Sequence, residues 1–263
     1  MIPKIIHYCW FGGKPKPESF SICLESWKKY LPDYEIIEWN ESNFDLNCCP
    51  YVQLAVQHSQ WAFVSDYARA LALYEKGGIY MDIDVEVKLS LDEFLHHRAF
   101  SGFEIKGSPF TALWATEKGH PWPKKVLEFY NQKTDFDLTT NTVFVSDLLV
   151  KHYKVDATKD EEQHLDDGIV IYPSTHFCLD LPKNYATHHF LGTWHKRDTP
   201  NPFKDQVHDH YKISEFIKLR DNRIIFNFTE VRKDFAIEDI LDKIPLKLII
   251  RYSLQKLKQK IFK

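Results

Sequence analysis

The stretch GGIYMDIDVEV, residues 77–87, limits the possible folds more than any other part of the sequence, because it places acids inside a run that otherwise reads as a buried strand. A glycine pair is typical of a helix end, and the apolar residues that follow predict one strand over 79–87. Side chains alternate across a strand, so Asp82 and Asp84 are expected on one face. Two unpaired carboxylates this close repel each other, and a divalent cation would keep both ionised. The stretch therefore predicts a cation site at the end of a strand.

The type of ligand narrows the choice of ion. Hard carboxylate oxygens favour Mn²⁺ or Mg²⁺ over zinc, and such ions typically bridge a carboxylate pair to the phosphates of a substrate. A nucleotide diphosphate is the expected substrate group. An exposed edge strand can also carry alternating acids, so the D-x-D pattern taken alone leaves a solvated strand as the alternative.

The first ninety residues predict an α/β fold with a parallel sheet. Apolar runs at 2–10 and 34–40 read as strands, and the run at 79–87 reads as a third. Between them, helical spacing predicts a helix over 17–30 and a mostly helical stretch over 51–76. The order βαβαβ implies parallel strands covered by helices, and ligands of such sheets bind beyond the carboxyl ends of the strands. The middle of the chain predicts further strands at 100–104 and 168–173, with helices near 122–132 and 143–153.

Composition excludes several classes of protein. A formal net charge of −3 gives no general basic footprint for nucleic acid, so no nucleic-acid partner is expected. The five cysteines form no C-x-x-C pair, and their odd number argues for reduced thiols in a cytosolic protein. The amino terminus has no secretion-signal pattern, and no apolar run is long enough to span a bilayer.

Two segments next to the D-x-D stretch carry a family resemblance. The run SDYAR at 65–69, followed by LYEKGGIYMDID at 73–84, resembles the signature of the DXD-containing sugar transferases of glycosyltransferase family 32. The opening IPKIIHYCWFGG is similar to the start of that family, and the same arrangement occurs in the glucosylating domain of the large clostridial toxins. The resemblance implies a type A glycosyltransferase fold, a nucleotide-sugar donor such as a UDP-sugar, a Mn²⁺ or Mg²⁺ ion, and transfer with retention at the anomeric carbon.

The resemblance also assigns residues to the donor. Trp10 would stack on the uracil base and Asn43 would contact the nucleotide; the alternative for Trp10 is an ordinary core aromatic. Asp66 and Arg69 lie three residues apart on a predicted helix, so both can face one ligand, and they match positions that hold the donor sugar and its phosphates. The plain alternative for this pair is a surface ion pair. Tyr80 and Asp82 would contact the ribose and the sugar.

For the metal, the resemblance implies Asp84 as a direct ligand, with Asp82 beside it. The segment YATHHFLGTW at 185–194 is similar to the family's carboxyl-terminal metal-site segment, in which a Trp follows the ligand by five residues. That spacing joins His189 to Trp194. His188 is the competing ligand, because adjacent strand residues face opposite ways.

One departure from the family concerns the acceptor side. Family members often carry Thr-Gly-Pro there, whereas LTTNTVF has Asn141 and Thr142. The acceptor and any residue that assists the chemistry are therefore left open, and no catalytic nucleophile is assigned.

Two other functions remain as alternatives. MDIDVEV also looks like the D-x-D-x-[TV] motif of haloacid-dehalogenase-type phosphatases, with Asp82 as nucleophile and Asp166 and Asp167 as metal acids. That motif normally ends the first strand, whereas here two βα units precede it. The non-enzyme alternative is a carbohydrate- or nucleotide-binding module that kept the fold without turnover.

The carboxyl-terminal part predicts an extension with a different role. We expect a glycosyltransferase catalytic domain over 1–211 and a helical, basic extension over 212–263. After Asp242 the chain has no acid and seven basic residues, and Ile250, Leu254, Leu257 and Ile261 form one helical stripe. This pattern predicts peripheral attachment to an anionic membrane surface at the inner face of the cell membrane. The location would suit a cytoplasmic transferase that builds capsular polysaccharide or O-antigen (lipopolysaccharide) repeats on a glycan or lipid-linked oligosaccharide acceptor. A helix that packs its stripe on the domain is the alternative.

Overall fold

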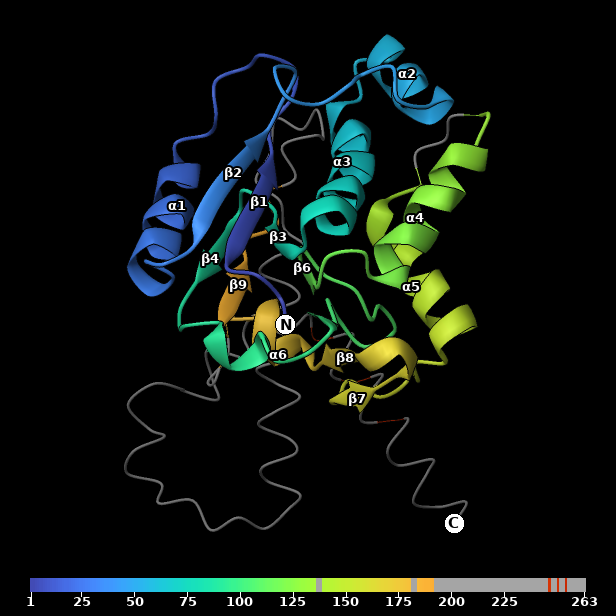
Figure 1. Cartoon of the computed structure of the whole chain (residues 1–263). Helices are drawn as coiled ribbons and strands as arrows, with labels where there is room; N and C mark the ends of the chain where they lie inside the picture. Colours follow the sequence, from blue (N-terminus) through green and yellow to red (C-terminus); the bar gives the residue numbers. More distant parts are fainter. Residues whose placement is uncertain (136–138, 181–183, 192–245, 247–249, 251–253, 255–263) are drawn as a thin grey trace. The chain divides into compact units, whose positions relative to one another are not determined.

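The computed structural model describes residues 1–135, 139–180 and 184–191, together with Leu246, Ile250 and Leu254. The described part is an α/β fold built on a seven-stranded sheet with the order β2-β1-β3-β6-β5-β8-β7, beside a two-stranded sheet of β4 and β9 (Figure 1). The strands are β1 (Ile5–Cys9), β2 (Glu35–Trp39), β3 (Gly78–Met81), β4 (Val85–Val87), β5 (Ala99–Gly102), β6 (Leu113–Thr116), β7 (Gln163–His164), β8 (Ile169–Tyr172) and β9 (Ala186–His188). The helices are α1 (Ser19–Tyr30), α2 (Pro50–Gln57), α3 (Trp61–Lys76), α4 (Pro121–Gln132), α5 (Asn141–Tyr153) and α6 (Ser174–Phe177), with 3₁₀ turns at Asp92–Phe94 and Asp166–Gly168.

Strand direction decides where a ligand can bind. β1 is parallel to β2 and to β3, β6 is antiparallel to both β3 and β5, and β8 is parallel to β5. Strands β1, β2, β3, β5 and β8 therefore all end at the same edge of the sheet. The segments that follow these strands meet at that edge, which is where α/β sheets bind their ligands.

Two apolar clusters cover the two faces of the main sheet. One contains Phe63 of α3, Trp122 of α4 and Leu149 of α5, and the other contains Trp27 of α1, Val85 of β4 and Phe177 of α6. Figure 1 shows α3, α4 and α5 together on one side, with α1 and the β4–β9 pair on the other. Both clusters are fully buried at these residues, so the sheet edge is held by a packed core on each side.

The joint between α3 and β3 depends on glycine and a buried histidine. Gly78 has a φ of 114°, and a Cβ added there would lie 2.6 Å from the carbonyl oxygen of Ile5. His7 of β1 is fully buried; its Nε2 is 2.8 Å from the carbonyl oxygen of Gly77, and its Nδ1 accepts a hydrogen bond from Trp39 Nε1 at 3.1 Å. Neutral His7 with its proton on Nε2 satisfies both bonds. This joint fixes the point at which β3 begins.

The predicted α/β class, the parallel βαβαβ start, the mostly helical stretch over 51–76 and the two middle helices are confirmed, and the single strand predicted over 79–87 is wrong. The stretch 51–76 is two helices, α2 and α3, separated at 58–60, where Ser59 has a φ of 55°. The predicted single strand over 79–87 is broken: β3 ends at Met81, and after a turn β4 leaves the main sheet to pair with β9. Asp82 and Asp84 therefore lie in a turn and not on one strand.

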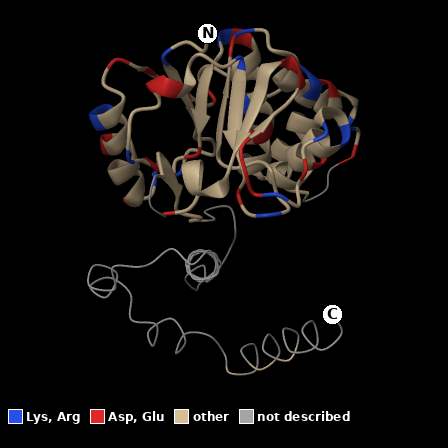
Figure 2. Ribbon diagram, turned by 90° about the horizontal axis from the view of Figure 1, so that it is seen from below, with Lys and Arg blue, Asp and Glu red and all other residues tan. Residues whose placement is uncertain are grey.

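The carboxyl-terminal predictions fall mostly outside the described residues. Outside the described residues lie the predicted domain boundary at 211/212, Trp194, Leu257 and Ile261. Leu246, Ile250 and Leu254 are described; each is helical and at least half of its surface is exposed. Of the helices in the described part, none has the length and apolar character needed to cross a membrane. Lys and Arg are interspersed with Asp and Glu over the described fold (Figure 2).

Candidate active site

The D-x-D motif forms the turn between β3 and β4, at the edge where the parallel strands end. The backbone N–H of Asp82 donates to the carbonyl of Ala112 at 3.1 Å, and the N–H of Val85 donates to the carbonyl of Asp82 at 3.0 Å. The first bond ties the turn to the start of β6, and the second closes it. The turn is thus anchored by backbone bonds that leave its carboxylates free to converge.

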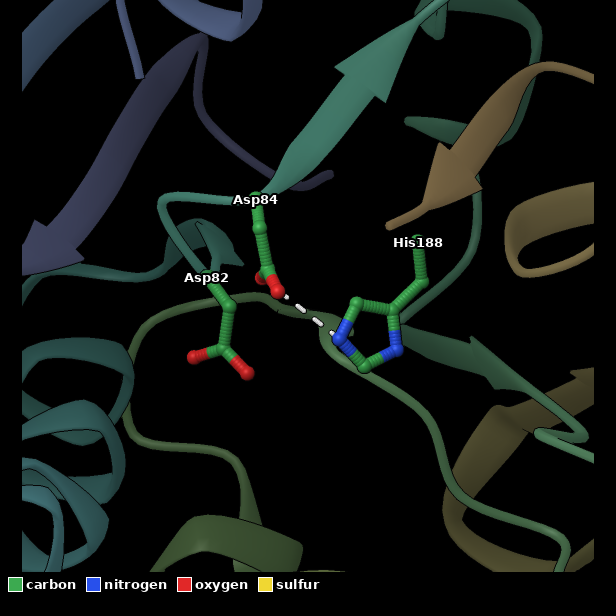
Figure 3. A group of neighbouring side chains, drawn as sticks. All are labelled: Asp82, Asp84 and His188. Carbon is green, nitrogen blue, oxygen red and sulfur yellow. Dashed lines mark ion pairs between the residues drawn. The ribbon is translucent and has the colours of Figure 1, made fainter. Parts of the chain in front are cut away.

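A histidine from a distant part of the chain joins the two carboxylates. One ligand atom from each of Asp82, Asp84 and His188 lies within 4.8 Å of the others, and in the described residues this is the one such group of three or more (Figure 3). The antiparallel pairing of β4 with β9 places His188 opposite Val85. His188 Nε2 lies 3.4 Å from Asp84 Oδ1.

The donor set fits a hard divalent cation. Two carboxylates and an imidazole are ligands that Mn²⁺ accepts readily, and Mg²⁺ can use the two carboxylates. Asp84 is buried and His188 is partly buried, and loss of contact with water alone disfavours a charge on either group. The imidazole of His188 lowers the pKa of Asp84, and Asp84 in turn raises the pKa of His188 well above its usual value. Three groups on two distant segments thus form a compact, charged centre.

The segment after β9 also holds Asp84 through its backbone. The N–H of Leu191 donates to Asp84 Oδ2 at 2.8 Å, and the N–H of His189 donates to the Asp84 carbonyl at 2.9 Å. The side chain of His189 turns to the other side, where Nε2 lies 2.9 Å from Glu86 Oε2. Glu86 is also paired with Lys88 at 2.9 Å. Of the two candidate ligands, the structure therefore brings His188, and not His189, to the D-x-D turn.

A second charged cluster lies on the other side of Asp82. Arg69 of α3 reaches Asp66 Oδ1 at 3.1 Å and Asp82 Oδ1 at 3.3 Å through the same Nη2 atom. Its guanidinium lies over the ring of Tyr80 at 4.5 Å, and the Tyr80 hydroxyl donates to Asp82 Oδ1 at 2.8 Å. The four residues Asp66, Arg69, Tyr80 and Asp82, all assigned to the donor by the family resemblance, thus form one network, called the donor network below.

This network is not the surface ion pair that stood as the alternative. Asp66 and Arg69 are 5% and 8% exposed. Burial raises the pKa of Asp66 to about 7, with Arg69 opposing the rise and Asp82 adding to it. Burial would lower the pKa of Arg69, but Asp82, Tyr80 and Asp66 raise it, so the guanidinium stays charged. The guanidinium is thus a buried cation held between two acids.

The two residues predicted to contact the nucleotide lie at the same sheet edge. Trp10 directly follows β1; it is partly buried, and its Nε1 donates to the carbonyl of Lys14 at 2.6 Å. Asn43 follows β2 in an exposed loop, where its Oδ1 accepts from the N–H of Asn40 and its Nδ2 donates to the carbonyl of Glu38. Both amide atoms of Asn43 therefore stabilise the loop, so any nucleotide contact would have to share them.

Asn141, where the sequence departs from the family's Thr-Gly-Pro on the acceptor side, lies close to the donor network. Asn141 begins α5 and is 5% exposed. Its Nδ2 donates to the Tyr130 hydroxyl at 3.1 Å, while its Oδ1 has no hydrogen-bond partner among the described residues. Burial raises the pKa of Tyr130, and Asp66 and Arg69 act on it electrostatically. Asn141 is thus connected to the network through Tyr130.

One residue at this edge escaped the sequence analysis. Glu104 lies two residues after β5, and its carboxyl is within electrostatic reach of His188, Asp82 and Asp84. The available signal was an acid directly after a predicted buried strand, FSGFE. That signal carries weight only when the strand order shows that β5 ends at the same edge as β3.

The topology argues against the phosphatase alternative. Asp166 and Asp167 lie in the 3₁₀ turn before β8, whereas Asp82 follows β3. β3 and β8 run in the same direction, so these acids lie at opposite edges of the sheet. The required set of Asp82 with Asp166 and Asp167 does not form.

Comparisons with known proteins agree with the transferase geometry. Residues 17–101 match the family described as "Glycosyltransferase sugar-binding region containing DXD motif". Over 130 residues the chain is 31% identical to inositol phosphoceramide mannosyltransferase 3 of Schizosaccharomyces pombe, a match that covers 48% of this chain and 36% of that protein. The chain therefore matches about a third of the length of this curated relative.

Similar solved structures are also glycosyltransferases. PaToxG glycosyltransferase is 20% identical with a TM-score of 0.43, over 57% of this chain and 70% of that one. A glycosyltransferase involved in glycosylation of the major capsid of PBCV-1 is 9% identical with a TM-score of 0.42, over 80% and 100%. Galactosyltransferase LgtC is 16% identical with a TM-score of 0.31, over 78% and 82%. The match to the DXD-containing sugar-transferase family covers residues 17–101, which contain the D-x-D turn and the Arg69 network.

Proposed function

We propose that this glycosyltransferase is a retaining, metal-dependent enzyme that moves a hexose from a nucleotide-sugar donor to a glycan or lipid-linked oligosaccharide. The observation that carries the proposal is the junction at Asp82, where the group formed with Asp84 and His188 meets the network formed with Asp66 and Arg69. A cation site and an anchored guanidinium side by side are what a sugar diphosphate requires.

Asp84, His188 and Asp82 would hold Mn²⁺ or Mg²⁺. When bound, the ion supplies positive charge to the diphosphate as the glycosidic bond breaks. On the other side of Asp82, Arg69 is positioned by Asp66 and Tyr80 and would stabilise the same growing charge. Asp66 would also accept a hydrogen bond from a sugar hydroxyl, because its carboxylate has further acceptor capacity beyond Arg69.

The reaction needs no protein nucleophile in this proposal. The bond from the anomeric carbon to the phosphate oxygen breaks, the acceptor oxygen forms a bond to the same carbon from the same face, and the acceptor proton passes to the departing phosphate. Retention follows from attack on the face that the leaving group vacates. The alternative is a carbohydrate- or nucleotide-binding module without turnover. Such a module would bind the donor but would not release nucleotide from it.

The donor is proposed as a UDP-sugar, with GDP-mannose as a second candidate. The UDP-sugar rests on the family resemblance, whereas GDP-mannose follows from the name of the fission-yeast relative, a mannosyltransferase. The proposed setting is synthesis of capsular polysaccharide or O-antigen at the inner face of the cell membrane. There the exposed apolar residues Leu246, Ile250 and Leu254, next to basic residues in the sequence, would contact the lipid surface.

A binding panel tests the donor and the ion together. The melting temperature is measured with UDP-glucose, UDP-galactose, UDP-N-acetylglucosamine, UDP-N-acetylgalactosamine and GDP-mannose, each with Mn²⁺ and with EDTA. A ligand that prefers the folded state raises the melting temperature by mass action, so one donor is expected to do so with Mn²⁺ and to lose the effect in EDTA. A shift of equal size in EDTA would contradict the metal role.

A further inference from the structure

Glu104 is held at the ligand edge of the sheet by backbone bonds. It follows β5, whose direction matches that of β3, so both segments leave the sheet at the same edge. The N–H of Phe103 donates to the carbonyl of Tyr172 at 2.8 Å, and the N–H of Glu104 donates to the carbonyl of Ser108 at 2.9 Å. Glu104 therefore has a fixed position in a closed loop.

The charged groups around the Glu104 carboxyl are the three candidate metal ligands. Burial raises its pKa; His188 opposes this rise, and Asp82 and Asp84 add to it. The carboxyl does not reach the group of ligand atoms within 4.8 Å that Asp82, Asp84 and His188 form. Among the described residues, it also has no hydrogen bond or ion pair to another side chain. Glu104 is thus a partly buried acid that lies outside the group of ligand atoms and within electrostatic reach of it.

Glu104 and Arg69 share Asp82 as an electrostatic partner and differ in their others. The strongest electrostatic partners of Arg69 are Asp82, Tyr80, Asp66 and Cys9. Glu104 instead shares its surroundings with Cys178, which lies against His188.

We propose that Glu104 is an outer-sphere carboxylate of the metal centre and raises its affinity for the ion; this inference rests on the proposed function. An octahedral ion with three protein ligands keeps positions for water, and a bound water donates hydrogen bonds to a nearby carboxylate. Glu104 has a backbone held by hydrogen bonds, a place at the edge where β3 and β5 end, and carboxylate oxygens without a side-chain partner among the described residues; all three ligands are within its electrostatic reach. It also adds a negative charge that favours a cation over an empty site. Glu104 is a positioning residue in this arrangement, because it acts on the ion through water and does not touch the substrate.

Titration with Mn²⁺ alone tests this role without donor or acceptor. Free Mn²⁺ is measured by electron paramagnetic resonance for the wild type, Glu104→Gln, Glu104→Asp, Glu86→Gln and Asp84→Asn. Outer-sphere partners of metal ligands typically change affinity about 10–100-fold, so Glu104→Gln is expected to weaken Mn²⁺ binding by about that factor and Glu104→Asp by less. Glu86→Gln removes the same charge close to the site, but its carboxylate is paired with Lys88 and His189, so affinity is expected to stay within about twofold.

The outcomes separate this inference from the proposed function. Wild-type affinity in Glu104→Gln, with binding lost in Asp84→Asn, would overturn the role of Glu104 and leave the metal centre intact. No Mn²⁺ binding by the wild type would overturn both. Equal losses in Glu104→Gln and Glu86→Gln would also overturn the specific role, because general charge would then explain the effect. Water-proton relaxation of bound Mn²⁺ adds a second readout: the number of bound waters is expected to be unchanged in Glu104→Gln, and a gain of one would show direct ligation instead.

Discussion

The imidazole of His188 lies against the carboxylate of Asp84, with Nε2 3.4 Å from Oδ1, although the two residues belong to segments far apart in the chain. The contact joins the end of β9 to the D-x-D turn. It exists because β9 pairs with β4 in a small sheet beside the main one.

This contact predicts different effects for two adjacent histidines. His188→Ala removes a candidate ligand and is expected to weaken Mn²⁺ binding and to lower the rate of nucleotide release by roughly 100-fold or more. His189→Ala removes a side chain paired with Glu86 and is expected to change both quantities less than about threefold. Paramagnetic resonance and steady-state kinetics measure the two effects. The reverse order would assign the ligand to His189.

A conservative change of Arg69 tests the donor network. Arg69→Lys keeps the charge but loses the planar group that contacts Asp66 and Asp82 and lies over Tyr80, so kcat/KM for the donor is expected to fall by about 100-fold. Mn²⁺ affinity is expected to change little. Arg98→Lys is the matched control, since Arg98 is exposed and paired with Glu117. Equal kinetics in both variants would remove Arg69 from the reaction.

The buried histidine at the α3–β3 joint predicts how stability depends on pH. Burial lowers the pKa of His7 to about 4 from its usual 6.5, so between these values the unfolded chain binds more protons than the folded one. Stability therefore falls as the pH drops from 6.5 to about 4, and His7 accounts for about 3 kcal/mol of that loss. Protonation of His7 would also place a proton on Nδ1, so that this atom could no longer accept the hydrogen bond from Trp39 Nε1.

Denaturant unfolding at pH 7 and pH 5 measures this effect. His7→Gln is expected to be less stable at pH 7 but to lose less stability than the wild type between the two pH values. His152→Gln, a change at an exposed histidine of α5, is expected to follow the wild type. A wild-type-like slope in His7→Gln would show that other groups cause the acid sensitivity.

Much of the sheet and one half of the site could be predicted from the sequence. The apolar runs around 5–9 and 35–39 mark β1 and β2, and the glycine pair marks the start of β3, because each signal is local. Asp82, Asp84, Asp66 and Arg69 could be named for the same reason: the motif and the helical spacing lie within about twenty residues.

The other half of the site depends on pairing between distant segments. The predicted strand over 79–87 breaks at the D-x-D turn, after which Val85–Val87 pairs with β9 and buries Val85 and Val87. The choice between His188 and His189 follows from the register in which β4 pairs with β9. The residues of β4 alone, or of β9 alone, do not determine that register. Glu104 becomes a candidate only when the strand order places the end of β5 beside the end of β3.

The basic carboxyl-terminal segment gives a separate prediction about location. Full-length protein is expected to sediment with phosphatidylglycerol vesicles at low salt and to be released as salt increases, because each basic residue near an anionic surface contributes about 1 kcal/mol. Deletion of 243–263 is expected to abolish sedimentation, and phosphatidylcholine vesicles serve as the control. Full-length protein that stays in the supernatant at low salt would contradict the membrane role and leave the transferase role unaffected.

The most direct test of the central claim is release of nucleotide by Asp84→Asn, measured with Mn²⁺ and the donor that stabilises the wild type. Asp84 is buried, paired with His188 and bonded to the backbone of Leu191, so this change is expected to lower the stability by about 1–3 kcal/mol while the protein still folds. Glu86→Gln, two residues away, is the matched control. We expect Mn²⁺-dependent release by the wild type and Glu86→Gln, and a loss of roughly 1,000-fold in folded Asp84→Asn. Wild-type turnover in folded Asp84→Asn, or turnover by the wild type that persists in EDTA, would contradict the assignment of the D-x-D turn as the metal centre of this transferase.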